Sequence, residues 1–186
     1  MRTPSHLIMT AVINYWIPQN QRKTFAFLLG SILPDVPFAI LTVVYTLYFT
    51  ILGSTPNDVS LMEYLHFDLF FSDPIWIILH NFFHSLVVGS MMLLVAFIKR
   101  DTLWGKRLMW LTLGILLHTI IDIFTHHSDG PLFLFPLNWN YRFESPISYW
   151  EPEHFGNQFR IFEYLLDTFL TIFLITRWWQ QYNKET

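Results

Sequence analysis

Long apolar stretches separated by short polar ones dominate the chain. Four of them approach the length of a membrane-spanning helix and cover residues 36–53, 74–98, 104–124 and 161–179. A helix needs about 20 apolar residues to cross roughly 30 Å of hydrocarbon. Pro74 suits the first turn of the second stretch, and the charged run from Lys99 to Asp101 ends it. The pattern predicts four long helices, the second and third of which form an antiparallel hairpin.

Shorter helical patterns occupy residues 5–16, 24–33 and 60–71, which are too short to cross a bilayer. Residues 131–158 are rich in Pro, Asn and aromatic residues without a clean period, and this predicts a long ordered cap loop. Residues 54–73 contain several polar and charged residues. If the first two spans cross the membrane in the same direction, this segment must cross back between them, and its polarity places it inside the bundle, away from lipid. We expect one domain over residues 1–186, an all-α polytopic membrane helical bundle with three to five crossings.

Composition agrees with a membrane protein. The 186 residues are 53% hydrophobic and 13% charged, whereas soluble domains carry about 25% charged residues. Basic residues gather in the hairpin loop and after the last apolar stretch, at Lys99, Arg100, Lys106, Arg107, Arg177 and Lys184. The positive-inside rule places them in the cytoplasm, so the opposite end of an inner-membrane protein faces outward. The net charge of −3 offers no basic patch, and we expect no direct binding to nucleic acid.

Two histidines interrupt the second apolar stretch. His80 and His84 are four residues apart, so a helix places them on one face, where both imidazoles can bind one metal ion. The chain has no cysteine, which leaves His, Asp and Glu as metal ligands. The alternative is a pair of hydrogen-bonded interior histidines. Ionisable groups in a membrane helix are costly and usually functional, which favours the metal.

The third stretch repeats this spacing with His118 and Asp122. In an antiparallel hairpin, the start of one helix lies beside the end of the next, so both pairs fall at the same membrane depth. The alternative is that His118 and Asp122 form a salt bridge or hydrogen bond only with each other. The alignment of the two pairs predicts one shared site.

Other polar residues can join this site. Asp35 stands between two prolines at the entrance to the first span, where it can bridge two metals or simply cap a helix. His6 is a further ligand candidate, and His126 is a candidate proton carrier. His127, Asp129, Glu151, Glu153, His154 and Glu163 remain weaker candidates at the rim or in the cap. His66 lacks a convincingly spaced partner and is expected outside the site.

Four sequence blocks then occur in order: PSHL, LGSILPDVP, HNFFHSL and GILLHTIIDIFTHHSDGPLFLFP. Together they resemble the small membrane-bound metal-dependent hydrolases of bacteria and archaea, some of which are labelled LexA-binding inner-membrane-associated hydrolases. The matching residues are His6, Asp35, His80, His84, Ser85, His118, Asp122, Thr125, Gly130 and Pro136. The chain departs from the family pattern at Asn81 and Phe83, where a difference in substrate is expected. A more remote similarity links the chain to zinc-dependent phospholipase C.

These resemblances imply a metal-dependent hydrolase. His and carboxylate ligands suit Zn²⁺, with Mn²⁺ or Fe²⁺ possible, and one or two ions would activate water. Expected ligands are His6, Asp35, His80, His84, His118 and Asp122, while Asp35 and His126 take the catalytic roles. The expected substrate is a lipid or amphiphile, with a phosphoester favoured, hydrolysed on the extracytoplasmic side. The alternative is a non-catalytic, metal-stabilised membrane scaffold or transport component.

Overall fold

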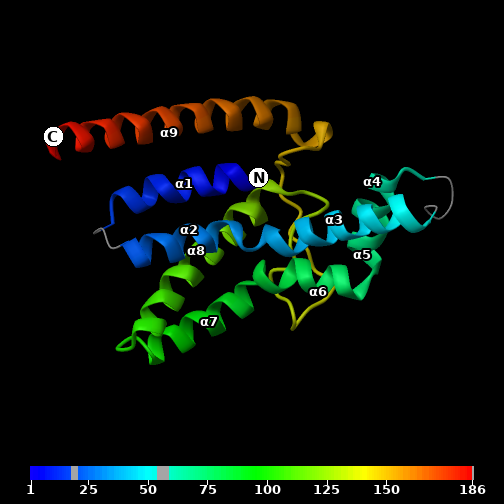
Figure 1. Ribbon diagram of the computed structural model, residues 1–186. Helices are drawn as coiled ribbons and strands as arrows, with labels where there is room; N and C mark the ends of the chain where they lie inside the picture. The colour runs from blue at the N-terminus through cyan, green and yellow to red at the C-terminus, as the bar shows by residue number, and fades with distance from the viewer. Residues whose placement is uncertain (18–20, 54–58, 186) are drawn as a thin grey trace.

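The computed structural model describes residues 1–17, 21–53 and 59–185, and every regular element among them is helical (Figure 1). The elements are α1 (Thr3–Tyr15), α2 (Gln21–Ile32), α3 (Asp35–Leu52), α4 (Leu61–Glu63), the π-helical η2 (Tyr64–Leu69), α5 (Phe70–Ser72), α6 (Pro74–Phe83), α7 (Leu86–Ile98), α8 (Leu103–Thr125), the 3-10 turn η3 (Pro152–His154) and α9 (Gly156–Glu185). The predicted all-α class is confirmed.

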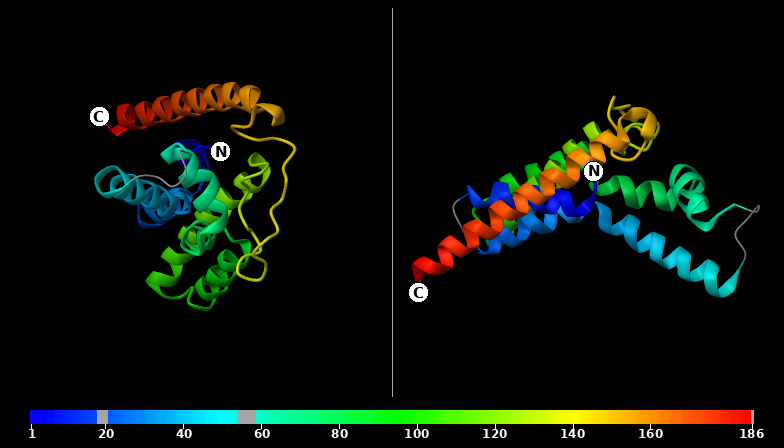
Figure 2. Two further views of the ribbon diagram at one scale, coloured as in Figure 1. Left: turned by 90° about the vertical axis from the view of Figure 1, so that its right-hand side faces the viewer. Right: turned by 90° about the horizontal axis from the view of Figure 1, so that it is seen from above.

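Helices α1, α2, α7, α8 and α9 lie on one side of the molecule, and α3 to α6 extend away from them as an arm (Figures 1 and 2). The arm has a small core of its own around Leu41, Leu65 and Trp76. The start of α3 and the end of α8 lie near the junction of the two parts, where the N-terminus also lies. The topology thus brings together chain positions far apart in the sequence.

Two glycines allow α2 and α8 to cross in close contact. A Cβ atom on Gly30 would lie 2.1 Å from the Leu111 carbonyl oxygen, and one on Gly114 would lie 2.3 Å from the Phe27 carbonyl oxygen. Both clashes are with backbone atoms, which cannot swing aside as a flexible side chain can. Larger residues would therefore push the two helices apart.

The second apolar stretch is not one straight helix, as the sequence suggested. It breaks after Phe83, and α6 and α7 meet at an angle of 48°. His84 leaves the helical conformation, with φ −88° and ψ 8°, while the Ser85 hydroxyl caps α7 by accepting from the Val88 N–H at 3.1 Å. Ser85 also donates to the Phe135 carbonyl. The break thus anchors the cap to this helix pair.

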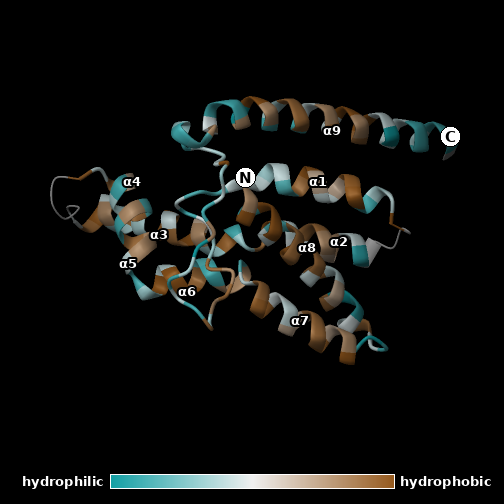
Figure 3. Ribbon diagram, turned by 180° about the vertical axis from the view of Figure 1, so that it is seen from behind, coloured by the Kyte–Doolittle hydropathy of each residue, from teal (hydrophilic) through white to brown (hydrophobic). Residues whose placement is uncertain are grey.

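Two described helices, α3 and α8, are long and apolar enough to cross a membrane, and the bent α6–α7 pair gives a third if it forms one span. The fourth predicted span lies within α9, which does not satisfy the same criterion. Three to five crossings therefore stay a prediction. Apolar residues cover much of α3 and the middle of α9, and many of them are exposed (Figure 3). Part of the suggested return across the membrane, residues 54–58, lies outside the described residues.

The cap is largely irregular, as predicted, with η3 as its helical turn among residues 131–158. Asn81 holds it in place: the buried amide accepts from the Leu132 N–H at 2.6 Å and donates to the Ile77 carbonyl at 2.8 Å. The oxygen and the nitrogen of this amide therefore both form hydrogen bonds within the fold. The difference in substrate expected at Asn81 stays a prediction.

Candidate metal centre

Four side chains converge at the junction of the arm and the main helices. Asp35 begins α3, His84 occupies the α6–α7 break, and His118 and Asp122 come from the last turns of α8. One ligand atom from each lies within 4.8 Å of all the others. We call these four residues the core cluster. Three are buried, and Asp35 is partly exposed, with 27% of its side chain accessible.

Backbone carbonyls orient both imidazoles. The Nδ1 of His84 lies 2.7 Å from the His80 carbonyl oxygen, and the Nδ1 of His118 lies 2.7 Å from the Ser31 carbonyl oxygen. Because a carbonyl only accepts, each Nδ1 carries the proton, and each Nε2 of a neutral ring keeps a lone pair. The two Nε2 atoms are 3.2 Å apart. A divalent ion between them, or a proton on one of the rings, would hold two nitrogens at that distance.

Carboxylate oxygens complete the set. The Oδ2 of Asp122 lies 3.0 Å from His118 Nε2 and 3.4 Å from His84 Nε2. The Oδ1 of Asp35 lies 3.4 Å and 3.6 Å from the same two nitrogens. Around zinc, ligands about 2.0–2.2 Å away stand roughly 3.3 Å from one another. The chemistry and the spacing of this donor set therefore fit a divalent ion.

The other two predicted ligands lie beside the core cluster. His6 stacks on His118 with ring centroids 3.7 Å apart, and its Nε2 lies 2.9 Å from Asp122 Oδ1. His80 stacks behind His84 at 4.4 Å, and neither of its ring nitrogens has a hydrogen-bond partner among the described residues. His80 lines the ligand cavity together with His84, and its role as a ligand stays a prediction.

His126, the candidate proton carrier, lies next to the cluster. Its Nε2 is 3.3 Å from the Met1 amino group, which also bonds Asp122 Oδ1 at 3.0 Å. Burial lowers the pKa of His126 to about 3. The ring is therefore neutral at pH 7.

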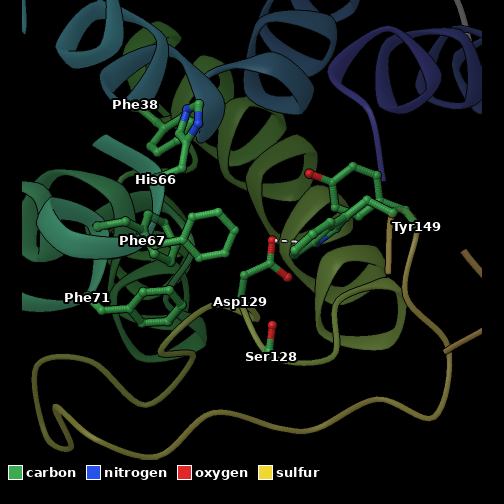
Figure 4. A pocket seen from close by; sticks show the side chains of 9 residues that line it. Phe38, His66, Phe67, Phe71, Ser128, Asp129 and Tyr149 are labelled. Carbon is green, nitrogen blue, oxygen red and sulfur yellow. Dashed lines mark hydrogen bonds between the residues drawn. The ribbon is translucent and has the colours of Figure 1, made fainter. Parts of the chain in front are cut away.

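One cavity opens onto the core cluster, and a second lies next to that cavity. The first, which we call the ligand cavity, has a volume of about 410 Å³, and Asp35, His80, His84, Asp122 and His126 contribute to its wall. The second, the aromatic cavity, measures about 530 Å³ (Figure 4). They share four wall residues, namely Phe38, Phe70, Asp129 and Tyr149. The two cavities therefore lie side by side.

The aromatic cavity includes residues that the sequence did not assign to a site. His66, expected outside the site, stacks on Phe38 and lines this cavity (Figure 4). The Trp150 indole N–H donates to Asp129 Oδ2 at 3.0 Å, and burial raises the pKa of Asp129 to about 6. The aromatic run around residues 64–71 was the available signal for this wall. The sequence could not show that this run lines a cavity, because the cavity forms only where the arm contacts the cap.

These features define an all-helical protein with a buried histidine and aspartate centre suited to a divalent metal. A family model described as zinc dependent phospholipase C matches residues 5–185, and the chain belongs to this family. The match confirms the more remote of the two resemblances and suggests hydrolase activity. No curated protein and no solved structure matches the chain.

Proposed function

We propose that the protein is a membrane-bound, metal-dependent hydrolase that cleaves a phosphoester of a lipid or a similar amphiphile. The observation that carries the proposal is the opening of the core cluster into the ligand cavity. A donor set closed on all sides would favour the scaffold alternative. Here Asp35, His84 and Asp122 all form part of the cavity wall, where a substrate can reach them. Membership of the phospholipase family supports a lipid substrate.

The core cluster would hold the ion, with zinc favoured by its nitrogen and oxygen donors, and His6 would complete a second position. Such an ion supplies Lewis acidity and lowers the pKa of water. In the hydrolysis, water forms a bond to phosphorus, the bond from phosphorus to the alcohol oxygen breaks, and that oxygen takes a proton. The partly exposed Asp35 would orient the water.

His126 would accept and return the proton. It lines the ligand cavity, and no partner bonds its Nδ1 among the described residues. Its low pKa makes it a weak base. A phosphate anion in the cavity would raise that pKa, because a nearby negative charge favours the protonated ring.

We also propose that α3, α8 and the α6–α7 pair lie in the inner membrane, with the core cluster towards the extracytoplasmic face. The basic loop between α7 and α8 is at the opposite end of α8 from the cluster, and the positive-inside rule assigns that loop to the cytoplasm. Phe67 and Phe71 line the aromatic cavity and are also exposed, so an apolar substrate could enter from lipid.

The function is tested with the zinc-loaded full chain and phospholipids labelled in the head group. We expect release of a phosphorylated head group by the wild type and none after chelation or in His84→Ala and Asp122→Ala. Asp101→Asn, an exposed carboxylate remote from the cluster, serves as control. Equal turnover in both cluster variants would refute the catalytic role. Cysteine labelling at positions 99 and 129 tests topology, and labelling of both from one side would refute it.

A further inference from the structure

A second group of metal-ligating side chains lies in the cap, away from the core cluster. His127 follows the end of α8, Glu151 precedes η3, and His154 ends it. One ligand atom from each lies within 4.8 Å of the other two. We call these three residues the cap cluster. None of them lines the ligand cavity or the aromatic cavity.

The backbone holds the cap cluster in place. Gly156 N–H donates to the Glu151 carbonyl at 2.9 Å, and Phe155 adopts a positive φ of 63°, so the chain folds back tightly over η3. A Cβ atom on Gly156 would lie 2.6 Å from the Glu151 carbonyl oxygen, which explains the glycine. This turn sets Glu151 and His154 beside His127, whose ring stacks on His154 with centroids 3.4 Å apart.

Hydrogen bonds from polar neighbours orient the side chains of the cap cluster. The Nδ1 of His127 lies 2.7 Å from the Ser145 carbonyl oxygen, so it carries the proton and Nε2 keeps its lone pair. Glu151 Oε1 accepts from the Ser128 N–H at 3.1 Å and from the Ser128 hydroxyl at 2.9 Å. No lysine or arginine in the described part of the chain pairs with Glu151. A carboxylate beside two imidazoles, without a basic partner, can bind a cation.

We propose that His127, Glu151 and His154 form a second divalent-metal site that takes zinc and ties the cap to the end of α8. Two histidines and one carboxylate are a ligand set that zinc accepts, and water can fill the fourth position. All three residues are partly exposed, so an ion can enter from solvent. The ion would link residues 127 and 154 and close most of the cap into one loop.

This site would also fix the outer wall of the aromatic cavity. Ser128 and Trp150, which line that cavity, are the direct chain neighbours of His127 and Glu151. The inference does not depend on lipid hydrolysis. It makes a claim about metal content alone, and it can hold even if the chain hydrolyses no phosphoester.

Zinc content per chain tests the site. The full-length wild type, His154→Ala and Glu151→Gln are dialysed against buffered zinc and analysed for metal, with Glu153→Gln as the matched control. Glu153 is an exposed carboxylate in the same turn and lies outside the cap cluster. We expect His154→Ala and Glu151→Gln to bind one zinc ion fewer than the wild type, and the control to bind the same number. An unchanged zinc content in both cluster variants would overturn the proposal.

A conservative variant covers the case in which His154→Ala loses all its zinc through unfolding. His154→Cys keeps a zinc ligand at this position, so we expect it to retain the full zinc content. Loss of zinc by this variant as well would overturn the site. In the wild type, added zinc should also slow proteolysis within residues 131–158, and an equal effect in Glu151→Gln would contradict the proposal.

Discussion

The core cluster and the cap cluster use similar side chains in different surroundings. In both, a backbone carbonyl fixes an imidazole Nδ1 and leaves Nε2 free. The core cluster is mostly buried, draws on three distant parts of the chain and opens into a cavity, whereas the cap cluster is partly exposed and opens into neither of the two cavities described above. The difference teaches that ligand chemistry alone does not make a reaction site. Access to the ligand cavity separates the two.

The largest effect should follow from Asp122→Asn. Asp122 bonds His6 through Oδ1 and approaches both cluster histidines through Oδ2. Without this charge, Asp35 is the one carboxylate left beside the two histidines of the core cluster, so we expect loss of the core ion and hydrolysis at the background rate. Metal analysis and turnover of labelled lipid measure both. Asp129→Asn, the control, should retain the core ion. If Asp129→Asn lost the ion too, the loss in Asp122→Asn would not identify Asp122 as a ligand.

Gly114→Ala should weaken metal binding indirectly, because it moves a backbone carbonyl that orients a ligand of the core cluster. The new methyl group would clash with the Phe27 carbonyl and push α2 from α8, which moves the Ser31 carbonyl away from His118. Overpacking of this kind costs about 1–3 kcal/mol of unfolding free energy. Loss of a group that orients a metal ligand weakens binding about 10–100-fold. Thermal unfolding and zinc titration test the two effects.

Gly89→Ala is the matched control for that variant, because its Cβ atom would meet only the end of the Leu116 side chain. This side chain can turn aside, so zinc affinity should stay close to the wild-type value. If Gly114→Ala and Gly89→Ala weakened zinc binding equally, the Ser31 carbonyl would not be the cause.

Glu163→Gln tests how α9, the helix that follows the cap, is anchored to the N-terminal residues. Glu163 in α9 is buried, accepts from the Arg2 backbone N–H at 2.9 Å and pairs with the Arg2 guanidinium at 2.8 Å. Glutamine keeps an acceptor but loses the charge, so we expect a stability loss of about 1–2 kcal/mol. Chemical denaturation measures it. Glu144→Gln, an exposed residue in the cap, should change stability far less.

The smallest effect on catalysis should come from His154→Ala. If the cap cluster has no part in the reaction, removing its ion leaves the core cluster intact, and the lipid turnover rate should change by no more than about twofold, as for a surface substitution. Initial rates at saturating substrate provide the measurement. A rate as low as that of Asp122→Asn would place the cap cluster in the reaction and erase the distinction between the two sites.

The sequence predicted the convergence of His84, His118 and Asp122 because helical spacing and a short hairpin loop are local features. It could not predict the helix break at His84, because that break depends on Ser85 capping α7 and bonding the cap. The roles of the Ser31 carbonyl and of Asn81 depend on contacts between distant segments. His154 lies 27 residues after His127, counted along the chain, and only the folded cap brings the two together.

Anomalous diffraction at the zinc edge, from crystals of the zinc-loaded full chain, tests the central claim most directly. We predict a strong anomalous peak between His84 Nε2, His118 Nε2 and the carboxylates of Asp35 and Asp122. A zinc-saturated crystal with these four side chains ordered and no anomalous peak between them would contradict the account.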